Sequence, residues 1–253
     1  KWSNGRQGRS SKRDAAKAQG AKALLFVDDT AFKYYSGAYK RRADSNTSIG
    51  LALDDGKTDD NTMLFMIATE ATINSIDASL LGSETPKTVS AAFALNQKKN
   101  STSVISKNVA SVVKGTEFPE EYIIISAHSD HVGVNDKGEV FNGADDDGSG
   151  SIAILEIAEA FRMAAEKGQA PKRSIIFLHV TGEEKGLLGS QYYTDIDPLV
   201  PLANTVANLN IDMIGRIDPK REGDRNYLYL IGSDKLSTEL HTLSEEVNKK
   251  YTN

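Results

Sequence analysis

The sequence contains no cysteine, so the chain can form neither disulfide bonds nor thiolate metal sites. Any zinc that it binds must be held by His, Asp and Glu, which favours a catalytic site over a structural one. Absence of cysteine is also compatible with a periplasmic or secreted protein, and we expect that location. The sequence starts at Lys1 without an initiator Met or a signal peptide, so we expect a processed or trimmed piece.

The sequence also lacks an apolar run long enough to span a bilayer, so we expect no membrane span. Basic residues are not in excess, because 30 Lys and Arg stand against 35 Asp and Glu, for a formal net charge of −5. No basic stripe is present either, which argues against nucleic acid as a partner. The 39% hydrophobic and 26% charged residues are typical of a soluble globular protein. A length of 253 residues suffices for one large domain or two ordinary ones.

The pattern of apolar residues changes near residue 87, and we place a domain boundary there. Residues 1–86 predict a small α+β module, with helices at 11–20 and 71–81, a helix cap within 75–77, strands at 23–27 and 63–67, and a loop or poorly ordered insert over 31–60. Residues 87–253 predict strands at 88–95, 103–105, 109–113, 122–125, 174–180, 204–211 and 227–231, with helices at 149–167, 189–193 and 236–247. Strands that alternate with helices indicate an α/β fold in which helices cover both faces of the sheet.

The short apolar strand at 122–125 leads directly into side chains of the kinds that bind metals. His128, Asp130 and His131 follow the strand, and Asp146 stands within three consecutive aspartates. Three adjacent carboxylates repel one another unless a cation neutralises them. Imidazole and carboxylate groups are suitable ligands for a divalent cation. The stretch therefore predicts a metal site at the exit of this strand.

Acidic residues also follow the next two predicted strands, at 183–184 and at Asp212. In an α/β sheet, ligands bind beyond the carboxyl ends of the strands, so we expect these residues to meet the metal site. Two metal ions that share a bridging carboxylate form a known hydrolytic arrangement. We assign His128 and Asp212 to the first ion, Glu184 to the second and Asp146 to the bridge. Glu183 cannot easily share an ion with its neighbour, so it is free to act as a general base.

Other polar residues near this stretch have different expected roles. Asp130, two residues after His128, is a candidate to orient that imidazole. His131 could replace His128 as a ligand, but strand alternation directs it to the opposite side, so we expect it to line or cap the loop. His179 lies within a predicted buried strand, where we expect a hydrogen-bonded core residue. The aspartate run also fits a plain acidic loop or a calcium loop, although it is shorter than an EF-hand loop and lacks its terminal Glu.

Four motifs together resemble the M28 family of zinc aminopeptidases. They are His128-Ser-Asp130, Gly143-Ala-Asp-Asp146-Asp-Gly-Ser-Gly150, Thr-Gly-Glu183-Glu184-Lys-Gly-Leu-Leu-Gly189-Ser and Asn-Ile-Asp212-Met. Their order and spacing are specific when taken together, with gaps of 18, 37 and 28 residues between His128 and Asp146, Asp146 and Glu183, and Glu184 and Asp212. The resemblance covers residues 88–253.

The resemblance implies an α/β/α sandwich around a mixed, mostly parallel sheet. It also implies removal of the N-terminal residue from peptide substrates by two zinc ions. Carried over by position, it implies one zinc held by His128, Asp146 and Asp212, another held by Asp146 and Glu184, Glu183 as the general base, and Asp130 as the orienting Asp. Residues 1–86 resemble part of a protease-associated domain, as inserted in many M28 enzymes.

One part of the family's pattern is absent from this sequence. The second zinc of the family has a further histidine, several tens of residues after the position of Asp212. The chain ends 41 residues after Asp212, and its only later histidine is His241. That residue is on the polar side of a predicted helix, so we expect it at the surface. We therefore expect the last ligand to lie beyond residue 253, with 87–253 lacking the C-terminal part of the catalytic domain.

Other functions remain open at this point. Within the fold, they are a carboxypeptidase-like M28 enzyme and a single-zinc enzyme similar to glutaminyl cyclase, which metal count and product analysis would separate. In another class is a catalytically silent, receptor-like binding module. The presence of Glu183 beside the four ligand candidates argues against silence, because a binding module does not need a free base there.

Overall fold

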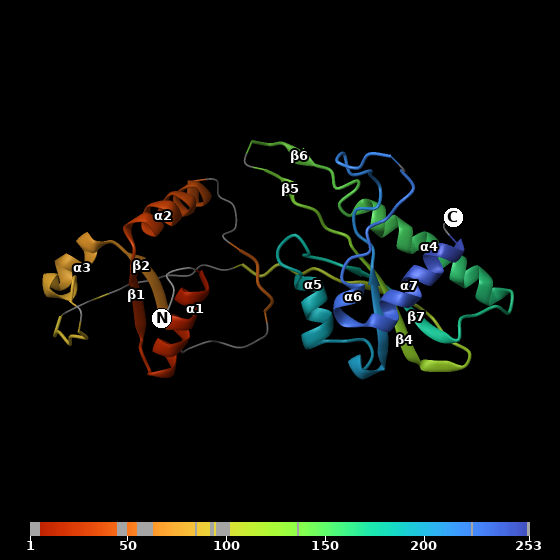
Figure 1. The fold of residues 1–253 in the computed structure, drawn as a ribbon, viewed down its shortest axis with the longest axis horizontal. Helices are drawn as coiled ribbons and strands as arrows, with labels where there is room; N and C mark the ends of the chain where they lie inside the picture. Colours follow the sequence, from red (N-terminus) through yellow and green to blue (C-terminus); the bar gives the residue numbers. More distant parts are fainter. Residues whose placement is uncertain are drawn as a thin grey trace. The chain divides into compact units, whose positions relative to one another are not determined.

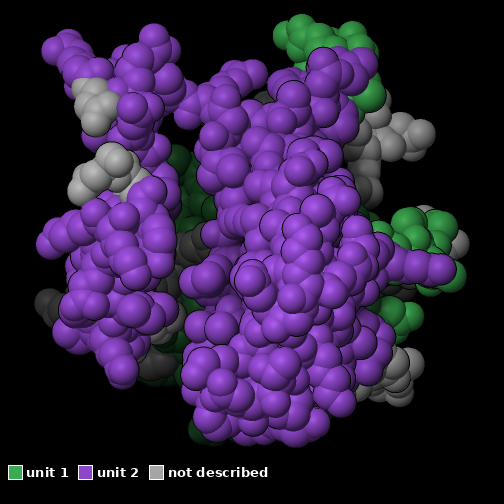
Figure 2. All heavy atoms as spheres, turned by 90° about the vertical axis from the view of Figure 1, so that its right-hand side faces the viewer, with its two compact units in different colours: residues 1–106, 134–139 green, residues 107–133, 140–253 purple. Residues whose placement is uncertain are grey.

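The computed structural model describes residues 6–44, 50–54, 63–83, 85–91, 94, 102–135, 137–223 and 225–251. The chain divides into two compact units, which Figure 2 shows in different colours. Unit 1 consists of Lys1–Ser106 with Val134–Glu139, and unit 2 consists of Lys107–Gly133 with Val140–Asn253.

Unit 1 is a small α+β arrangement around two parallel strands. Its elements in chain order are α1 (Arg6–Ala18), β1 (Ala23–Val27), α2 (Asp29–Asp44), β2 (Leu64–Ala68), α3 (Glu70–Asp77) and a 3₁₀ turn (Ala78–Leu80). Strands β1 and β2 pair in parallel from Ala23 opposite Leu64 to Val27 opposite Ala68. The two strands and two helices predicted for this region are confirmed. Thr69 Oγ1 accepts the N–H of Thr72 and caps α3, whereas Asp77, within the cap predicted at 75–77, accepts the N–H of Ser79 at 2.8 Å and caps the 3₁₀ turn instead.

The loop predicted over residues 31–60 is wrong for its first part, because helix α2 occupies Asp29–Asp44. The carboxylate of Asp28 accepts the N–H of Ala31 at 2.8 Å and so caps this helix. Tyr34 and Tyr39 are exposed, so α2 lacks the continuous apolar stripe that would have revealed it in the sequence. Residues 45–49 and 55–60 of the predicted loop lie outside the described residues.

Unit 2 is built on a four-stranded mixed sheet with the order β3-β7-β4-β8. Figure 1 labels its two central strands, β4 and β7. The strands are β3 (Val109–Val113), β4 (Phe118–His128), β7 (Arg173–Val180) and β8 (Thr205–Asn210). Strand β4 is parallel to both β7 and β8, whereas β3 is antiparallel to β7. Two short strands, β5 (Gly133–Val134) and β6 (Val140–Phe141), form a separate pair. The predicted α/β class with a mixed, mostly parallel sheet is confirmed.

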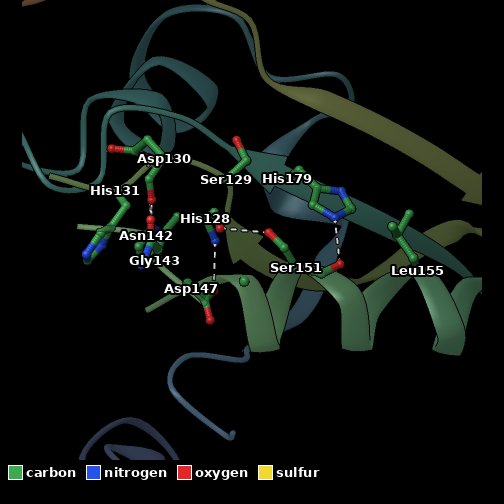
Figure 3. Close-up of a pocket in the computed structure, with 11 residues that line it drawn as sticks. His128, Ser129, Asp130, His131, Asn142, Gly143, Asp147, Ser151, Leu155 and His179 are labelled. Carbon is green, nitrogen blue, oxygen red and sulfur yellow. Dashed lines mark hydrogen bonds and ion pairs between the residues drawn. The ribbon is translucent and has the colours of Figure 1, made fainter. Parts of the chain in front are cut away.

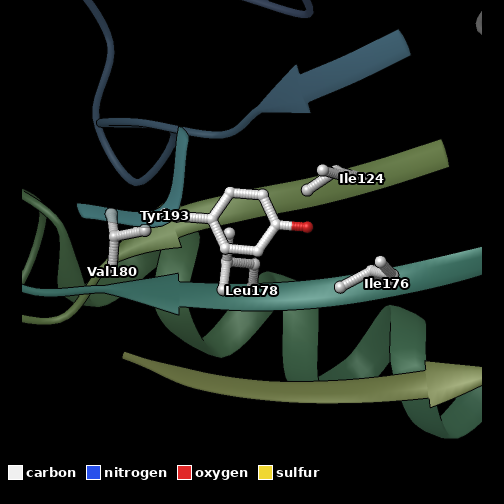
Figure 4. Close-up of a cluster of buried hydrophobic side chains, with 5 residues drawn as sticks. All are labelled: Ile124, Ile176, Leu178, Val180 and Tyr193. Carbon is white, nitrogen blue, oxygen red and sulfur yellow. The ribbon is translucent and has the colours of Figure 1, made fainter. Parts of the chain in front are cut away.

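Helical segments pack on both faces of this sheet because the side chains of β4 and β7 alternate between the faces. On one face, Ile154 of helix α4 (Gly148–Glu166) packs against Ile125, Ala127, Ile175 and Phe177. On the other face, Tyr193 packs against Ile124, Ile176, Leu178 and Val180, as Figure 4 shows. Tyr193 belongs to a π-helical turn (Tyr192–Ile196) that continues the short helix α5 (Leu188–Gln191). Every residue of both clusters faces away from water, so the sheet is fixed from both sides.

Several predicted elements of residues 87–253 differ from the structure. Residues 103–105 and 227–231 are not strands, because neither segment pairs with a strand among the described residues. Tyr229 instead donates its hydroxyl to Asp218 at 3.0 Å, and Ile231 is 90% exposed. The predicted strand at 88–95 is irregular at 88–91 and 94, and its other residues lie outside the described part.

The remaining predicted helices are confirmed with small shifts in their bounds. Helix α4 ends before Gly168, and the final helix is divided into α6 (Ser233–Leu236) and α7 (Thr238–Tyr251). Strand β4 begins at Phe118, four residues before the strand predicted at 122–125. None of the helices within the described residues is both long and apolar enough to cross a membrane.

Replacing Ile154 by alanine should lower the free energy of unfolding by about 2–5 kcal/mol, because a fully buried side chain is lost and a cavity remains. The matched control is Ile152→Ala on the same helix, where the isoleucine is 59% exposed. This control should change stability by less than about 1 kcal/mol. Urea unfolding of both variants measures the difference, and equal losses would contradict the packing of α4 against the sheet.

Candidate metal centre

The candidate metal centre begins at His128, the last residue of β4, whose side chain is only 2% exposed. Its Nε2 atom lies 3.2 Å from Asp146 Oδ1 and 3.8 Å from Asp212 Oδ2. The other ring nitrogen, Nδ1, lies 2.9 Å from the backbone carbonyl oxygen of Asp130. When Nδ1–H donates to this carbonyl, Nε2 carries the lone pair and is free to bind a cation.

A second group of donor atoms lies beside the first. His131 Nδ1 is 2.8 Å from Glu184 Oε1 and 3.9 Å from Asp146 Oδ2. Ligand atoms of these three residues lie within 4.8 Å of one another. His131 Nδ1 and Glu184 Oε1 are buried, and although they lie 2.8 Å apart they do not meet the geometry of a hydrogen bond, so neither atom has a hydrogen-bond partner among the described residues. Buried polar atoms that converge without hydrogen bonds fit a site for a cation.

Asp146 is the residue that approaches both groups, because one of its oxygens faces His128 and the other faces His131. Asp147 also lies near His128 and Asp212, within 4.8 Å of them. Its carboxylate is already occupied by three backbone N–H groups, those of His128 at 3.1 Å, Gly150 at 3.0 Å and Met213 at 3.3 Å. Figure 3 shows the first of these bonds. We therefore assign Asp146, and not Asp147, to the shared position.

Asp130 was predicted to orient the His128 imidazole with its carboxylate. In the structure, the backbone carbonyl of Asp130 lies closest to that ring, and Asp130 Oδ1 is 3.8 Å from His128 Nδ1. The carboxylate instead accepts the N–H groups of Glu183 at 3.0 Å and Glu184 at 3.3 Å. Asp130 thus contacts His128 through its backbone and the adjacent acidic pair through its side chain.

The surroundings shift the pKa of three groups in the site. Burial raises the pKa of Glu183, His128 opposes this effect, and the charges of Glu184 and Asp212 add to it. Burial alone would lower the pKa of His128, but the Asp130 carbonyl and the nearby carboxylates outweigh it, so the net shift is upward. Burial also raises the pKa of Asp147, against the three N–H groups that it accepts. Burial is therefore the main cause of the shifts of Glu183 and Asp147, whereas a hydrogen bond and neighbouring negative charges raise the pKa of His128.

Two residues at the site were not identified correctly from the sequence. His131 was expected to line or cap the loop, whereas the structure brings it to Glu184 and Asp146. Asn108 was not singled out, although its amide donates to Gly189 O at 2.8 Å and accepts the N–H of Thr181 at 3.2 Å. Asn108 therefore joins the two ends of the 181–189 segment that carries the acidic pair. No repeated pattern marks Asn108, because its partners lie more than 70 residues away in the sequence.

The other two histidines lie outside both donor groups. His179 Nε2 is 3.0 Å from the backbone oxygen of Ser151, so the predicted hydrogen bond of this half-buried residue is confirmed. His179 also lines a cavity of about 390 Å³ together with Leu155 and the 128–131 segment (Figure 3). His241 Nδ1 lies 3.0 Å from Ser233 Oγ, which places its ring against the short helix α6.

Comparison with known proteins identifies the family. Residues 108–253 match the model of peptidase family M28, which is more than half of the chain. The chain belongs to family M28. The resemblance found in the sequence motifs is therefore confirmed, whereas a protease-associated domain in residues 1–86 stays a prediction.

Curated M28 relatives have two kinds of name. A probable glutamate carboxypeptidase from Arabidopsis thaliana is 34% identical over 111 residues, which are 43% of this chain and 15% of that protein. An aminopeptidase from Mus musculus is 34% identical over 109 residues, which are 43% of this chain and 14% of that protein. The match thus spans about one seventh of the length of these relatives.

Similar solved structures are described as aminopeptidases. BSAP, a zinc aminopeptidase from Bacillus subtilis, is 28% identical, covers 56% of this chain and 32% of that chain, and has a TM-score of 0.44. An aminopeptidase from Aneurinibacillus sp. strain AM-1 is 22% identical, covers 81% of this chain and 42% of that chain, and has a TM-score of 0.35.

Replacing Asp130 by asparagine should leave one of the N–H groups of Glu183 and Glu184 without its acceptor and speed its hydrogen exchange, because the amide side chain has only one accepting oxygen. It should also weaken zinc binding by about 10–100-fold, the usual effect of losing a residue that orients a ligand. Exchange of the two amides and zinc titration measure these effects. Unchanged exchange together with weakened zinc binding would instead support the sequence-based role, in which the carboxylate orients His128.

Proposed function

We propose that this chain carries the active site of a zinc exopeptidase that removes the N-terminal residue of peptides with two metal ions. One observation carries this proposal, the position of Asp146 between two separate His-carboxylate groups. A carboxylate with one oxygen toward each group is suited to bridge two cations. Membership in a peptidase family supports peptides as the class of substrate.

In this proposal, His128, Asp146 and Asp212 hold one ion, and His131, Asp146 and Glu184 hold the other. The donor set fits zinc, because it consists of imidazole nitrogens and carboxylate oxygens without sulfur. The two orphaned buried atoms, His131 Nδ1 and Glu184 Oε1, provide the structural test of this fit. When bound, zinc supplies a Lewis acid that polarises a carbonyl and lowers the pKa of water.

Glu183 is the proposed general base. Its Oε2 lies 4.0 Å from His128 Nε2, at the edge of the site, and it belongs to neither donor group. The N–H bond to Asp130 fixes its backbone, and burial raises the pKa of its carboxyl. A carboxyl tuned in this way can take a proton from the attacking water and deliver it to the amine that leaves.

A carboxypeptidase-like reaction is the second candidate, because several relatives are named probable glutamate carboxypeptidases. Both reactions use the same metal centre and base, so they differ in which end of the peptide is recognised. A single-zinc enzyme similar to glutaminyl cyclase and a silent binding module are less consistent with two donor groups beside a free base. Incubating the protein with dipeptides, N-acetylated dipeptides and C-terminal amides distinguishes the first two, since blocking the N-terminus abolishes only aminopeptidase cleavage.

The remaining assignments are part of the same proposal. We propose that residues 1–86 form a partial protease-associated domain and that the protein acts in the periplasm or outside the cell. The parallel pair of β1 and β2 with three helices is the arrangement to compare with that of protease-associated domains.

Replacing Glu183 by glutamine should leave zinc content unchanged and lower kcat by about 10²–10⁴-fold, because proton transfer is lost while the ligands remain. Elemental analysis and peptide hydrolysis by the same preparations measure the two effects. Glu222→Gln, at an exposed position outside the site, is the matched control and should behave like the wild type. Full activity of Glu183→Gln would overturn the assignment of the base.

Replacing Asp146 by alanine should deplete both zinc ions together, since it removes the one carboxylate that both groups share. His131→Ala should weaken only the second ion, by about 10–100-fold in affinity, because His128 and Asp212 retain the first. Zinc anomalous scattering from crystals of both variants counts and locates the ions. A single lost ion in Asp146→Ala would argue against bridging, and two full sites in His131→Ala would remove His131 from the ligand set.

A further inference from the structure

The loop after Asp212 is held by side chains of the aspartate run and of the serine that follows it at 149. Three successive backbone N–H groups of the loop donate to these side chains. Those of Met213, Ile214 and Gly215 donate respectively to Asp147 Oδ1 at 3.3 Å, Ser149 Oγ at 3.0 Å and Asp145 Oδ1 at 2.8 Å. The two segments are 65–70 residues apart in the sequence. We call Asp145, Asp147 and Ser149 the cradle.

The cradle is itself fixed to the rest of the site. Ser149 Oγ donates to the backbone oxygen of Asp145 at 2.7 Å while it accepts from Ile214. Asp147 is 1% exposed and also accepts the N–H groups of His128 and Gly150. Each acceptor therefore has little freedom to move, and Asp147 links the end of β4, the start of α4 and the loop.

Asp212 has few other constraints on its position. It follows β8, an edge strand among the described strands, and its side chain is 41% exposed. The last bond to the neighbouring strand is from Ile211 N to Ser126 O at 2.8 Å. Met213 then adopts a left-handed conformation with φ of +54°, which is uncommon for a residue other than glycine. Such a conformation persists only when the surroundings hold it in place.

We propose that Asp145, Asp147 and Ser149 are positioning residues that hold Asp212 at the distance from His128 and Asp146 needed to bind the first ion. The inference rests on the proposed metal centre and assigns no ligand role to the three residues. It explains why Asp147 approaches the ligands although its oxygens are occupied by backbone N–H groups. It also gives each of the three consecutive aspartates a separate contact, with only the middle one directed to the two donor groups.

Ser149→Ala tests the cradle most directly, because it removes one acceptor and no charge. Zinc titration of the metal-free protein should show about a 10–100-fold loss of affinity for one ion and less than about a 3-fold change for the other. Hydrogen exchange at the amides of 213–215 should become faster in the same variant. Ser149→Thr, which keeps the hydroxyl, should restore both readouts. Ser244→Ala, a helix serine outside the site, is the matched control and should change neither.

Asp145→Ala, which removes the oxygen that accepts the Gly215 N–H, extends the test to a residue outside both donor groups, and it should weaken the same ion as Ser149→Ala. Loss of both ions in parallel, together with a lower melting temperature, would show a purely structural role and overturn the proposal. Unaltered zinc affinities would overturn it as well. Failure of the wild type to bind zinc would instead refute the metal centre, and unprotected 213–215 amides in the wild type would refute the cradle regardless of metal.

Discussion

Parallel pairing of β4 with β7 and β8 determines where His128, the acidic pair at 183–184 and Asp212 lie. In this register, His128 is opposite Val180, and Ser126 is opposite Asn210, so all three strands end at the same edge of the sheet. The residues that follow these ends are the acidic pair at 183–184 and Asp212. A shift of the strand pairing by one residue would turn buried side chains to the other face of the sheet. The two buried clusters oppose such a shift, so they also maintain the geometry of the site.

The site must also overcome the repulsion among seven carboxylates close to one strand exit. In the structure these carboxylates fall into two sets, according to the groups that they contact. Asp130, Asp145 and Asp147 accept backbone N–H groups, which satisfy their charge without a cation. Asp146, Glu183, Glu184 and Asp212 remain directed toward the histidines. In the proposed site, two divalent ions would offset the four charges of the second set.

Much of this arrangement could be predicted from the sequence, because period-two apolar strands and acidic strand exits are local patterns. Helix α2 was missed because its exposed tyrosines interrupt any apolar stripe, and 227–231 was misjudged because an apolar run indicates a strand only if a partner is available. His131 was misplaced because alternation applies only within a strand, and β4 ends at His128. The contacts of Asn108 and Asp130 depend on residues about 50 to 80 positions away, which no local pattern encodes.

In the proposed site, the aspartate run serves binding and positioning at the same time. Its middle residue faces the two donor groups. Asp145 and Asp147, on either side, accept N–H groups of the loop that follows Asp212 at the end of an edge strand. An edge strand has hydrogen bonds on one side only, so its end would otherwise be the least fixed part of the sheet. Attaching that end to the N-terminus of α4, a helix buried against the sheet, transfers the rigidity of the core to Asp212. The first ion's ligands then depend on the packing of α4 as much as on their own side chains.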